Sequence, residues 1–460
     1  MKSSTKSLSK KWVLSATISM FIFSACQKKI DQPFTQEEIA SAANSNNQHG
    51  HLQQTKTYSS EVVYKWIDLQ LRLMQTSSPF IGGLPVSRVF GYTGIALYES
   101  VVPGMPAYQS LSGQLNQFPD MPNTQPGVAY HWPSNANAAI AAMTRNLFPT
   151  ASAANKVSID SLENTLNNEY KNSVSIEVWQ RSIAFGKSVA QLVFDWAKTD
   201  GADHANDAYT PPVGPGLWER TAPAFAAAFG PYWKNNRQLV VGSFDGADPP
   251  PPPAYSTDPS SDFYKMVKEV YDISQTLTPE QRAIGLYYRD NPGFGGGHYM
   301  SILNIVLRQE NAMLDVSALA FVKAGIVSVD AGIECWKVKY IYNNLRPITY
   351  IRNVLGFTTW NPLFGTPGFP DYISGHSTIG GAVAVALTSV FGDNYHFTNN
   401  TFSYLNMPDQ HYTSFYQMAE QIGDSRVYAG IHYKISCTEG NKTGKKVAQN
   451  ILNTVKFLKE

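Results

Sequence analysis

Apolar residues recur at helical spacing along most of this chain, and alternating strand-like patterns of useful length are scarce. Val62, Trp66, Leu69 and Leu73 would share one face of a helix. Similar patterns cover further segments, at residues 176–196, 263–277, 301–342, 377–391, 415–422 and 440–458. With 460 residues, of which 43% are hydrophobic, the chain can also bury a sizeable core. The sequence therefore predicts an all-α fold.

Five consecutive prolines, Pro249 to Pro253, interrupt the helical pattern. Proline lacks a backbone N–H and cannot continue a helix, so the run favours an extended connection. We expect a helical amino-terminal half over residues 59–245, a proline-rich connector over 246–261 and a helical carboxyl-terminal half over 262–460. The two halves should pack into one unit, with the connector as a rigid link rather than a docking motif for a partner domain.

The first 26 residues have the character of an export signal. Four lysines and no acidic residue precede an apolar run from Trp12 to Phe23, too short to span a bilayer permanently, and Ser24-Ala25-Cys26 follows. This ending is typical of bacterial lipoproteins, so we expect cleavage of the signal peptide 1–25 and lipid attachment at Cys26; an ordinary cleaved signal is the alternative. The protein would be exported and anchored only through Cys26 to a bacterial outer or inner membrane, periplasmic or surface-facing. Polar residues 26–58 would form a flexible tether.

The charge balance and the cysteine count exclude two classes of protein. Without residues 1–25 the chain has 32 Lys and Arg side chains against 35 Asp and Glu. This slightly acidic balance argues against a protein that binds nucleic acid through a basic surface. Three cysteines are too few for a disulfide scaffold, and none forms a CxxC pair of the kind that binds zinc.

A first short motif places two cations ahead of a proline. Lys339 and Arg346 are separated by nearly two helical turns, so both can project from one helix face. Pro347 predicts that the helix ends near Arg346. By itself, this pair is also typical of a solvated surface.

A second motif joins a tight turn to a helix of small residues. Ser374, Gly375 and His376 lead into the segment 378–387. A Ser-Gly turn at a helix start presents unpaired backbone N–H groups and the positive end of the helix dipole, which together bind an anion. Gly375 would let an oxyanion approach its own N–H closely. Alone, the motif also fits an N-cap serine beside an unrelated histidine.

A third motif combines Arg426 with His432. The planar fork of arginine suits tetrahedral oxyanions, and a neutral histidine nitrogen can bind a metal or attack phosphorus. Six helical residues turn by about 600°, so the two side chains would not share one stripe. We expect Arg426 to reach the anion from nearer the start of its helix. Alone, the motif also fits a surface arginine and a buried, hydrogen-bonded histidine.

In this order and spacing, the three motifs resemble the signature of the vanadium-dependent haloperoxidases and their relatives, the type 2 phosphatidic acid phosphatases. The resemblance extends over residues 336–433. It implies two packed helical bundles of the vanadium haloperoxidase type and one vanadate per chain as cofactor. Hydrogen peroxide would oxidise a halide, iodide first, to a hypohalous-acid-type oxidant, with small organic molecules as further acceptors.

The resemblance also implies roles for individual residues. The oxygens of vanadate or phosphate would be bound by the side chains of Lys339, Arg346, Ser374 and Arg426 and by the amide of Gly375. His432 would be the apical ligand of vanadium. His376 would be the acid–base residue, and Lys339 would also act in catalysis as a fixed positive charge that polarises peroxide.

Two positions depart from the pattern of the superfamily. Ile373 replaces the usual proline before Ser374, which should change only the stiffness of the turn. Ser436 lies four residues after His432, where the phosphatases have the aspartate that orients and activates the histidine. Without that carboxylate a phosphohistidine mechanism loses its obvious support. An acid phosphatase stays open as an alternative, and a lipoprotein that binds phosphate or vanadate without turnover is a second one.

Aromatic residues near the motifs bear on the choice of halide. By the same resemblance, Trp336 and Phe369 match the aromatic wall beside the vanadate in chloroperoxidase-type enzymes and bacterial iodoperoxidases. A dry aromatic wall suits a weakly hydrated halide, although both residues would also fit an ordinary core. Tyr287, Tyr288 and His298 are further candidates for the halide pocket.

Two cysteines lie close to the motifs in sequence. Cys335 adjoins Trp336, and Cys437 follows His432 by five residues. If the motifs meet in space the two thiols would approach each other, and export would permit a disulfide. Both a disulfide and two free thiols stay open from the sequence.

Overall fold

Helices form nearly all the regular structure of the computed structural model, which describes residues 53–78, 81–289 and 297–460. The predicted signal peptide, Cys26 and most of the predicted tether lie outside these residues. The described residues all belong to one compact unit. The all-α prediction is confirmed.

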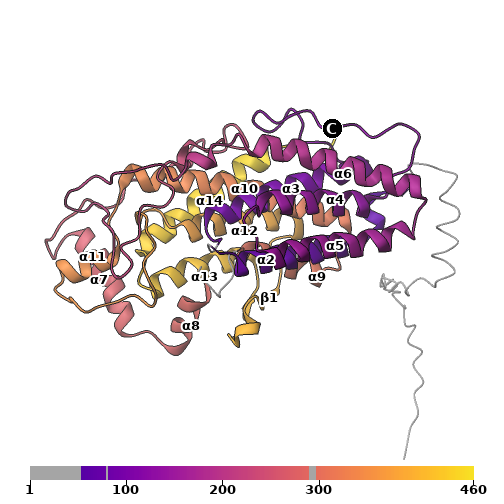
Figure 1. The fold of residues 1–460 in the computed structure, drawn as a ribbon. Coiled ribbons are helices and arrows are strands. Elements are labelled where there is room, and N and C mark those ends of the chain that lie inside the picture. The colour runs from indigo at the N-terminus through magenta and orange to yellow at the C-terminus, as the bar shows by residue number, and fades with distance from the viewer. Residues whose placement is uncertain (1–52, 79–80, 290–296) are drawn as a thin grey trace, which may run out of the picture. The chain divides into compact units, whose positions relative to one another are not determined.

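Most helices fall in two groups along the chain (Figure 1). Before the proline run, the described residues form α2 (Glu61–Thr76), α3 (Leu84–Val101), α4 (Trp132–Leu147), α5 (Ala153–Lys171) and α6 (Ile176–Ala197). After it, they form α7 (Asp262–Gln275), α8 (Pro279–Tyr287), α9 (His298–Gln309), α10 (Leu314–Tyr342), α11 (Pro347–Asn353), α12 (Gly375–Phe391), α13 (Phe415–Tyr428) and α14 (Lys434–Thr454). A small antiparallel sheet pairs β1 (Phe397–Asn399) with β2 (Gln410–Tyr412), with Phe397 opposite Tyr412.

Helix α10 connects the two groups because it packs against α3 on one side and α12 on another (Figure 1). It is the one helix among the described residues that is long and apolar enough to cross a membrane. However, 83% of its most apolar window is buried inside the protein. A helix that is apolar all round is the expected core helix of a large fold.

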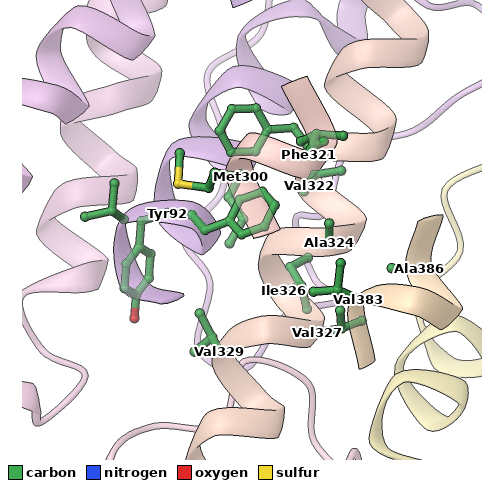
Figure 2. Close-up of a cluster of buried hydrophobic side chains, with 14 of the residues drawn as sticks. Tyr92, Met300, Phe321, Val322, Ala324, Ile326, Val327, Val329, Val383 and Ala386 are labelled. Carbon is green, nitrogen blue, oxygen red and sulfur yellow. The ribbon is translucent and has the colours of Figure 1, made fainter. Parts of the chain in front are cut away.

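The core between these helices is closely packed (Figure 2). Met300 of α9 lies near Phe321 of α10, and Val383 of α12 lies near Val327 of α10. The backbones of α3 and α10 also approach closely, since a Cβ at Gly325 would lie 2.7 Å from the carbonyl oxygen of Phe90.

Helix ends follow local sequence signals. The side chains of Ser175, Ser261 and Ser374 accept hydrogen bonds from backbone N–H groups at the starts of α6, α7 and α12. The single helical pattern expected over 301–342 is in fact two helices. The chain reverses between them at Asn311, whose φ of 47° is left-handed.

The long segment 198–261 has neither an α-helix nor a strand, although all of it is described. It contains the short 3-10 helices η3 (Ala202–His204) and η4 (Trp233–Asn235). Asp330 of α10 anchors this segment, because its buried carboxylate accepts hydrogen bonds from the N–H groups of Leu239 and Val240, at 2.7 and 3.1 Å. The proline run then passes the second motif, where the hydroxyl of Tyr372 donates to the carbonyl of Pro250.

The predicted boundaries of the halves stay a prediction. Within the predicted tether, residues 53–58 are described and contact the helices. The short 3-10 helix η1 (Thr55–Thr57) lies there, and the buried hydroxyl of Thr55 donates to the carbonyl of Val101 at 2.9 Å. Other 3-10 helices are η2 (Val102–Gly104) and η5 (Ser403–Leu405).

Candidate active site

The two cations of the first motif converge without sharing a helix. Helix α10 ends at Tyr342, and Asn343 has a left-handed φ of 46° that reverses the chain. Arg346 then occupies the N-cap position of α11. The expected common helix face was therefore wrong. The ring centroid of Phe369 nevertheless lies 5.1 Å from Lys339 Nζ and 4.8 Å from Arg346 Cζ, so one aromatic ring contacts both cations.

Lys339 is fully buried and held by the turn before α12. Its ammonium donates to the carbonyl oxygens of Pro370 at 2.9 Å and Asp371 at 2.8 Å. Burial lowers the pKa of Lys339 to about 7, because a charged ammonium loses solvation in the interior. A bound anion would restore the charged form.

Arg346 is oriented by backbone carbonyls and has donor capacity left over. Its Nε donates to Phe369 O at 2.8 Å, and its Nη1 donates to Ile431 O at 2.7 Å. Its Nη2 is buried and has no hydrogen-bond partner among the described residues. Burial also lowers the pKa of Arg346, to about 10, so the guanidinium stays charged at neutral pH. An orphan charged donor of this kind calls for an anionic acceptor.

The second motif forms the start of α12 as predicted. Ser374 is the N-cap and its backbone N–H donates to Ser436 O at 3.0 Å, while Gly375 is the first residue of the helix. A Cβ at Gly375 would lie 3.0 Å from the ring of Trp336, so glycine allows the indole to pack against the helix start. The backbone carbonyl of His376 accepts a hydrogen bond from the hydroxyl of Tyr299 at 2.7 Å.

The third motif spans a helix end and the following turn. Arg426 lies in the last turn of α13, so the expectation that it would lie nearer the start of its helix was wrong. Its Nη1 donates to the carbonyl of Tyr288, and its guanidinium lies 5.5 Å from the ring centroid of Phe364. His432 follows after the chain turns at Gly430, just before α14.

The ring of His432 has different surroundings at its two nitrogens. Nε2 lies 3.1 Å from Arg346 Nη1, and Nδ1 lies 2.9 Å from Asp371 Oδ1. Burial, followed by the positive charges of Arg346, Lys339 and Arg426, lowers the pKa of His432 well below its usual value. The imidazole is therefore neutral at neutral pH and has a nitrogen available for a metal or phosphorus atom.

Asp371 was missed in the sequence analysis. It lies three residues before Ser374, within the second motif, and its adjacency to Ser374 was the only sequence signal for it. Its carboxylate is fully buried. Burial raises the pKa of Asp371 to about 7, and Arg346 and Lys339 oppose that rise.

A cavity of about 320 Å³ opens beside these groups. Of the predicted halide-pocket residues, Trp336, Phe369, Tyr288 and His298 line it, together with Gly375, His376, Arg426 and His432. Tyr287 does not line the cavity. Its hydroxyl instead donates to the carbonyl of Asn399 at 2.9 Å, and its assignment to the halide pocket stays a prediction. Phe229 and Phe364 line the cavity too, and nothing in their local sequence indicated it.

Cys335 and Cys437 are both buried and both free thiols. The thiol of Cys335 donates to the carbonyl of Ile373 at 3.5 Å. The site therefore contains no disulfide between these two described residues.

These residues fit a tetrahedral oxyanion such as vanadate. Arg426 and His432 line the cavity, whereas Lys339 and Arg346 are fully buried behind its wall, in contact with the ring of Phe369. Such clustering is unfavourable without a counter-anion, and Arg346 Nη2 has no acceptor in the described protein. The neutral nitrogen of His432 completes a set of donors suited to an anion with a metal centre.

Comparison with known proteins agrees with this geometry. A family model described as the VCPO second helical-bundle domain matches residues 319–460. A crystal structure described as the first bacterial vanadium-dependent iodoperoxidase is 31% identical, with a TM-score of 0.79, and the match covers 88% of this chain and 98% of that one. No curated protein matches the chain.

Two further crystal structures are similar in fold. The holo form of a bacterial vanadium-dependent chloroperoxidase has a TM-score of 0.60 at 13% identity, covering 83% of this chain and 95% of its own. The apo form of a bacterial vanadium-dependent chloroperoxidase has a TM-score of 0.62 at 15% identity, and the match covers 81% of this chain and 94% of that one. The predicted pair of helical bundles of the haloperoxidase type is confirmed. Because 88% of this chain matches the iodoperoxidase at 31% identity, this chain belongs to the vanadium-dependent haloperoxidases, which are peroxidases of the oxidoreductase class.

Proposed function

We propose that this protein oxidises iodide with hydrogen peroxide and uses vanadate as its cofactor. The observation that carries the proposal is the convergence of Lys339, Arg346 and Arg426 around His432 beside an aromatic cavity wall. Hydrogen peroxide and a halide are the substrates expected of a haloperoxidase, and small organic molecules would be acceptors of the oxidised halogen.

The choice of iodide is supported by the cavity wall and by one comparison. The ring centroids of Trp336 and Phe369 lie 5.1 Å apart in that wall. Iodide is a large and weakly hydrated anion, so it loses little by entering an apolar cavity, and it is the halide least demanding to oxidise. The 31% identical structure is that of an iodoperoxidase.

The residues that would hold vanadate have distinct tasks. Nε2 of His432 would bind the metal. The oxyanion oxygens would be bound by Lys339, Arg346, Ser374, Arg426 and the amide of Gly375. When bound, vanadate supplies a Lewis acid that activates hydrogen peroxide.

The protein's own groups would exchange protons and exclude water. His376 lines the cavity, where its ring can exchange a proton with hydrogen peroxide. The bond from Tyr299 to its backbone carbonyl fixes the position of this residue at the helix start. Lys339, in the charged form that a bound anion favours, adds a positive charge beside the site, and the aromatic wall keeps water from it.

Purified protein with and without added orthovanadate tests the proposal. We expect peroxide-dependent triiodide formation only with vanadate, and slower oxidation of bromide and chloride under the same conditions. Equal rates with bromide would contradict the iodide preference alone. Absence of any halide oxidation in the presence of vanadate would contradict the proposed function.

The contact between Asp371 and His432 supports phosphate ester hydrolysis as a second candidate. A carboxylate beside Nδ1 raises the basicity of the histidine, which is the support that a phosphohistidine mechanism requires. His376 would then protonate the leaving oxygen. Cleavage of a phosphate ester that orthovanadate inhibits, without halide oxidation, is the outcome expected of this candidate.

We also propose export and lipid attachment at Cys26, on the sequence evidence given above, with Cys26 itself outside the described residues. Cells fed radiolabelled palmitate should incorporate label into the wild type and not into Cys26→Ala. Equal labelling of both would contradict the lipid anchor.

A further inference from the structure

A buried carboxylate contacts the histidine proposed as the vanadium ligand. Asp371 lies in the turn before α12, where its backbone N–H donates to Asn344 O at 2.9 Å and its carbonyl accepts from Lys339 at 2.8 Å. These backbone bonds fix the residue on both sides. Its Oδ1 lies 2.9 Å from Nδ1 of His432 and 3.9 Å from Nη1 of Arg346.

The other ring nitrogen must be free of a proton in this arrangement. Nε2 of His432 lies 3.1 Å from Nη1 of Arg346, and a guanidinium N–H can only donate. Nε2 is therefore the acceptor, and the single proton of the neutral ring lies on Nδ1, which contacts Asp371 Oδ1 at 2.9 Å without the alignment of a hydrogen bond. A histidine that binds a metal through Nε2 needs this tautomer.

Ser436 does not fulfil the same role. Its hydroxyl is 3.5 Å from Nδ1 of His432, at the outer limit of a hydrogen bond, and it donates instead to the backbone carbonyl of Asp371 at 3.1 Å. A carboxylate beside the histidine, which the phosphatases have at the position of Ser436, thus comes here from a different part of the chain.

We propose that Asp371 is a positioning residue that holds the ring and the tautomer of His432 so that Nε2 faces the bound metal. This inference rests on the proposed use of vanadate. Asp371 acts through His432 and does not itself touch the oxyanion.

Vanadate and inorganic phosphate should depend differently on Asp371. Inorganic phosphate needs only the cations and the helix start, whereas vanadate also needs a bond from Nε2. Loss of the carboxylate should weaken the binding of vanadate. It should leave the binding of phosphate unchanged or make it tighter, because a negative charge near Arg346 and Lys339 has gone.

The test measures the dissociation constants of vanadate and inorganic phosphate for three variants of the full chain by titration calorimetry. For Asp371→Ala we expect vanadate affinity to fall by about 10–100-fold with no loss of phosphate affinity. Asp371→Asn keeps an acceptor oxygen, so its vanadate affinity should lie between that of Asp371→Ala and that of the wild type. Glu334→Gln is the matched control, since Glu334 is an equally buried carboxylate that pairs with Lys337 at 2.8 Å; both affinities should be unchanged.

Equal losses of vanadate and phosphate affinity in the Asp371 variants, or no loss of either, would overturn the positioning role. Histidine-selective ¹⁵N labelling of the wild type gives a second measurement that needs no stable Asp371 variant. The His432 signal, assigned by its absence in His432→Gln, should be that of a neutral ring protonated at Nδ1, and the opposite tautomer would overturn the inference.

The two proposals fail in distinguishable ways. A wild type that does not bind vanadate would overturn both the proposed function and the role of Asp371. The positioning role alone would be overturned if the wild type binds vanadate and oxidises iodide while the ratio of vanadate affinity to phosphate affinity is the same in the Asp371 variants as in the wild type.

Discussion

The ring of Phe369 covers the guanidinium of Arg346, with 4.8 Å between the ring centroid and Cζ. The same residue accepts a hydrogen bond from Arg346 Nε at its backbone carbonyl, at 2.8 Å. Lys339 Nζ lies 5.1 Å from the same ring centroid. One residue thus binds two buried cations, through its ring and its backbone.

This relationship predicts a difference between two aromatic substitutions. Phe369→Leu keeps the backbone carbonyl and much of the apolar bulk but removes the ring beside both cations. Phe229→Leu removes a ring from the same cavity wall, one for which the described residues show no cation contact. Urea unfolding should show Phe369→Leu to be less stable than Phe229→Leu by about 1–2 kcal/mol, the size of a partly desolvated cation–π contact. Equal stabilities would contradict the proposed role of the ring.

A second prediction concerns the fork of Arg346. Lysine would keep the charge, but it cannot bond to Phe369 O and Ile431 O and still offer a third donor to an anion. Arg346→Lys should therefore weaken vanadate binding by about 10–100-fold, the worth of one charged hydrogen bond. Arg352→Lys is the matched control. Arg352 also donates to a backbone carbonyl, that of Trp360 at 2.8 Å, but it does not line the cavity. Similar vanadate affinities for the two variants, measured by titration, would count against a specific role for Arg346.

A third prediction follows from the charges of the site. Burial lowers the pKa of Lys339 to about 7 and raises the pKa of Asp371 to about 7. As pH rises through this range, Lys339 loses its positive charge and Asp371 gains a negative one, so both changes weaken anion binding. Sulfate is a suitable probe because its own charge is constant near neutral pH. Its affinity should fall as pH rises, by about tenfold per pH unit for each proton taken up on binding.

The control for this pH dependence is Lys339→Met, which removes one of the two titrating groups. Its sulfate affinity should be lower than that of the wild type at pH values below about 7 and should change less steeply with pH. A wild-type affinity that is constant or increases with pH would show that these two groups do not titrate as described.

A fourth prediction concerns the packing that brings the motifs together. A Cβ at Gly444 of α14 would overlap the carbonyl oxygen of Thr378 on α12. Gly444→Ala should therefore separate the two helices and lower the free energy of unfolding by about 1–3 kcal/mol. Because His432 directly precedes α14, vanadate affinity should fall as well. Gly214→Ala, where the nearest atom is Leu217 Cδ1 at 3.4 Å, should change neither quantity.

Much of the fold was predictable from local patterns. The apolar spacing near Ile176 and Phe263 predicted α6 and α7 closely, because each helix buries a single stripe. The split between α9 and α10 was not predicted, since the turn at Asn311 depends on a left-handed conformation that no glycine or proline marks. The folded but irregular segment 198–261 was not predicted either, because tertiary bonds to Asp330 hold it rather than any local period.

The candidate site was predictable where the motifs carry the chemistry in sequence. Ser374 and Gly375 are at the helix start that the Ser-Gly turn indicates. The contact of Asp371 with His432 could not be read in the same way, because it forms only when the turns before α12 and α14 meet. The placement of Tyr287 could not be read from the sequence either. It neighbours Tyr288 in sequence, but its side chain turns to Asn399.

The most direct test of the central claim is a titration of vanadium-free protein with orthovanadate, with bound vanadium and peroxide-dependent triiodide formation measured on the same samples. The rate should rise in proportion to bound vanadium and reach its plateau at one vanadate per chain. Triiodide formation by vanadium-free protein, or vanadate that binds without any iodide oxidation, would contradict the account.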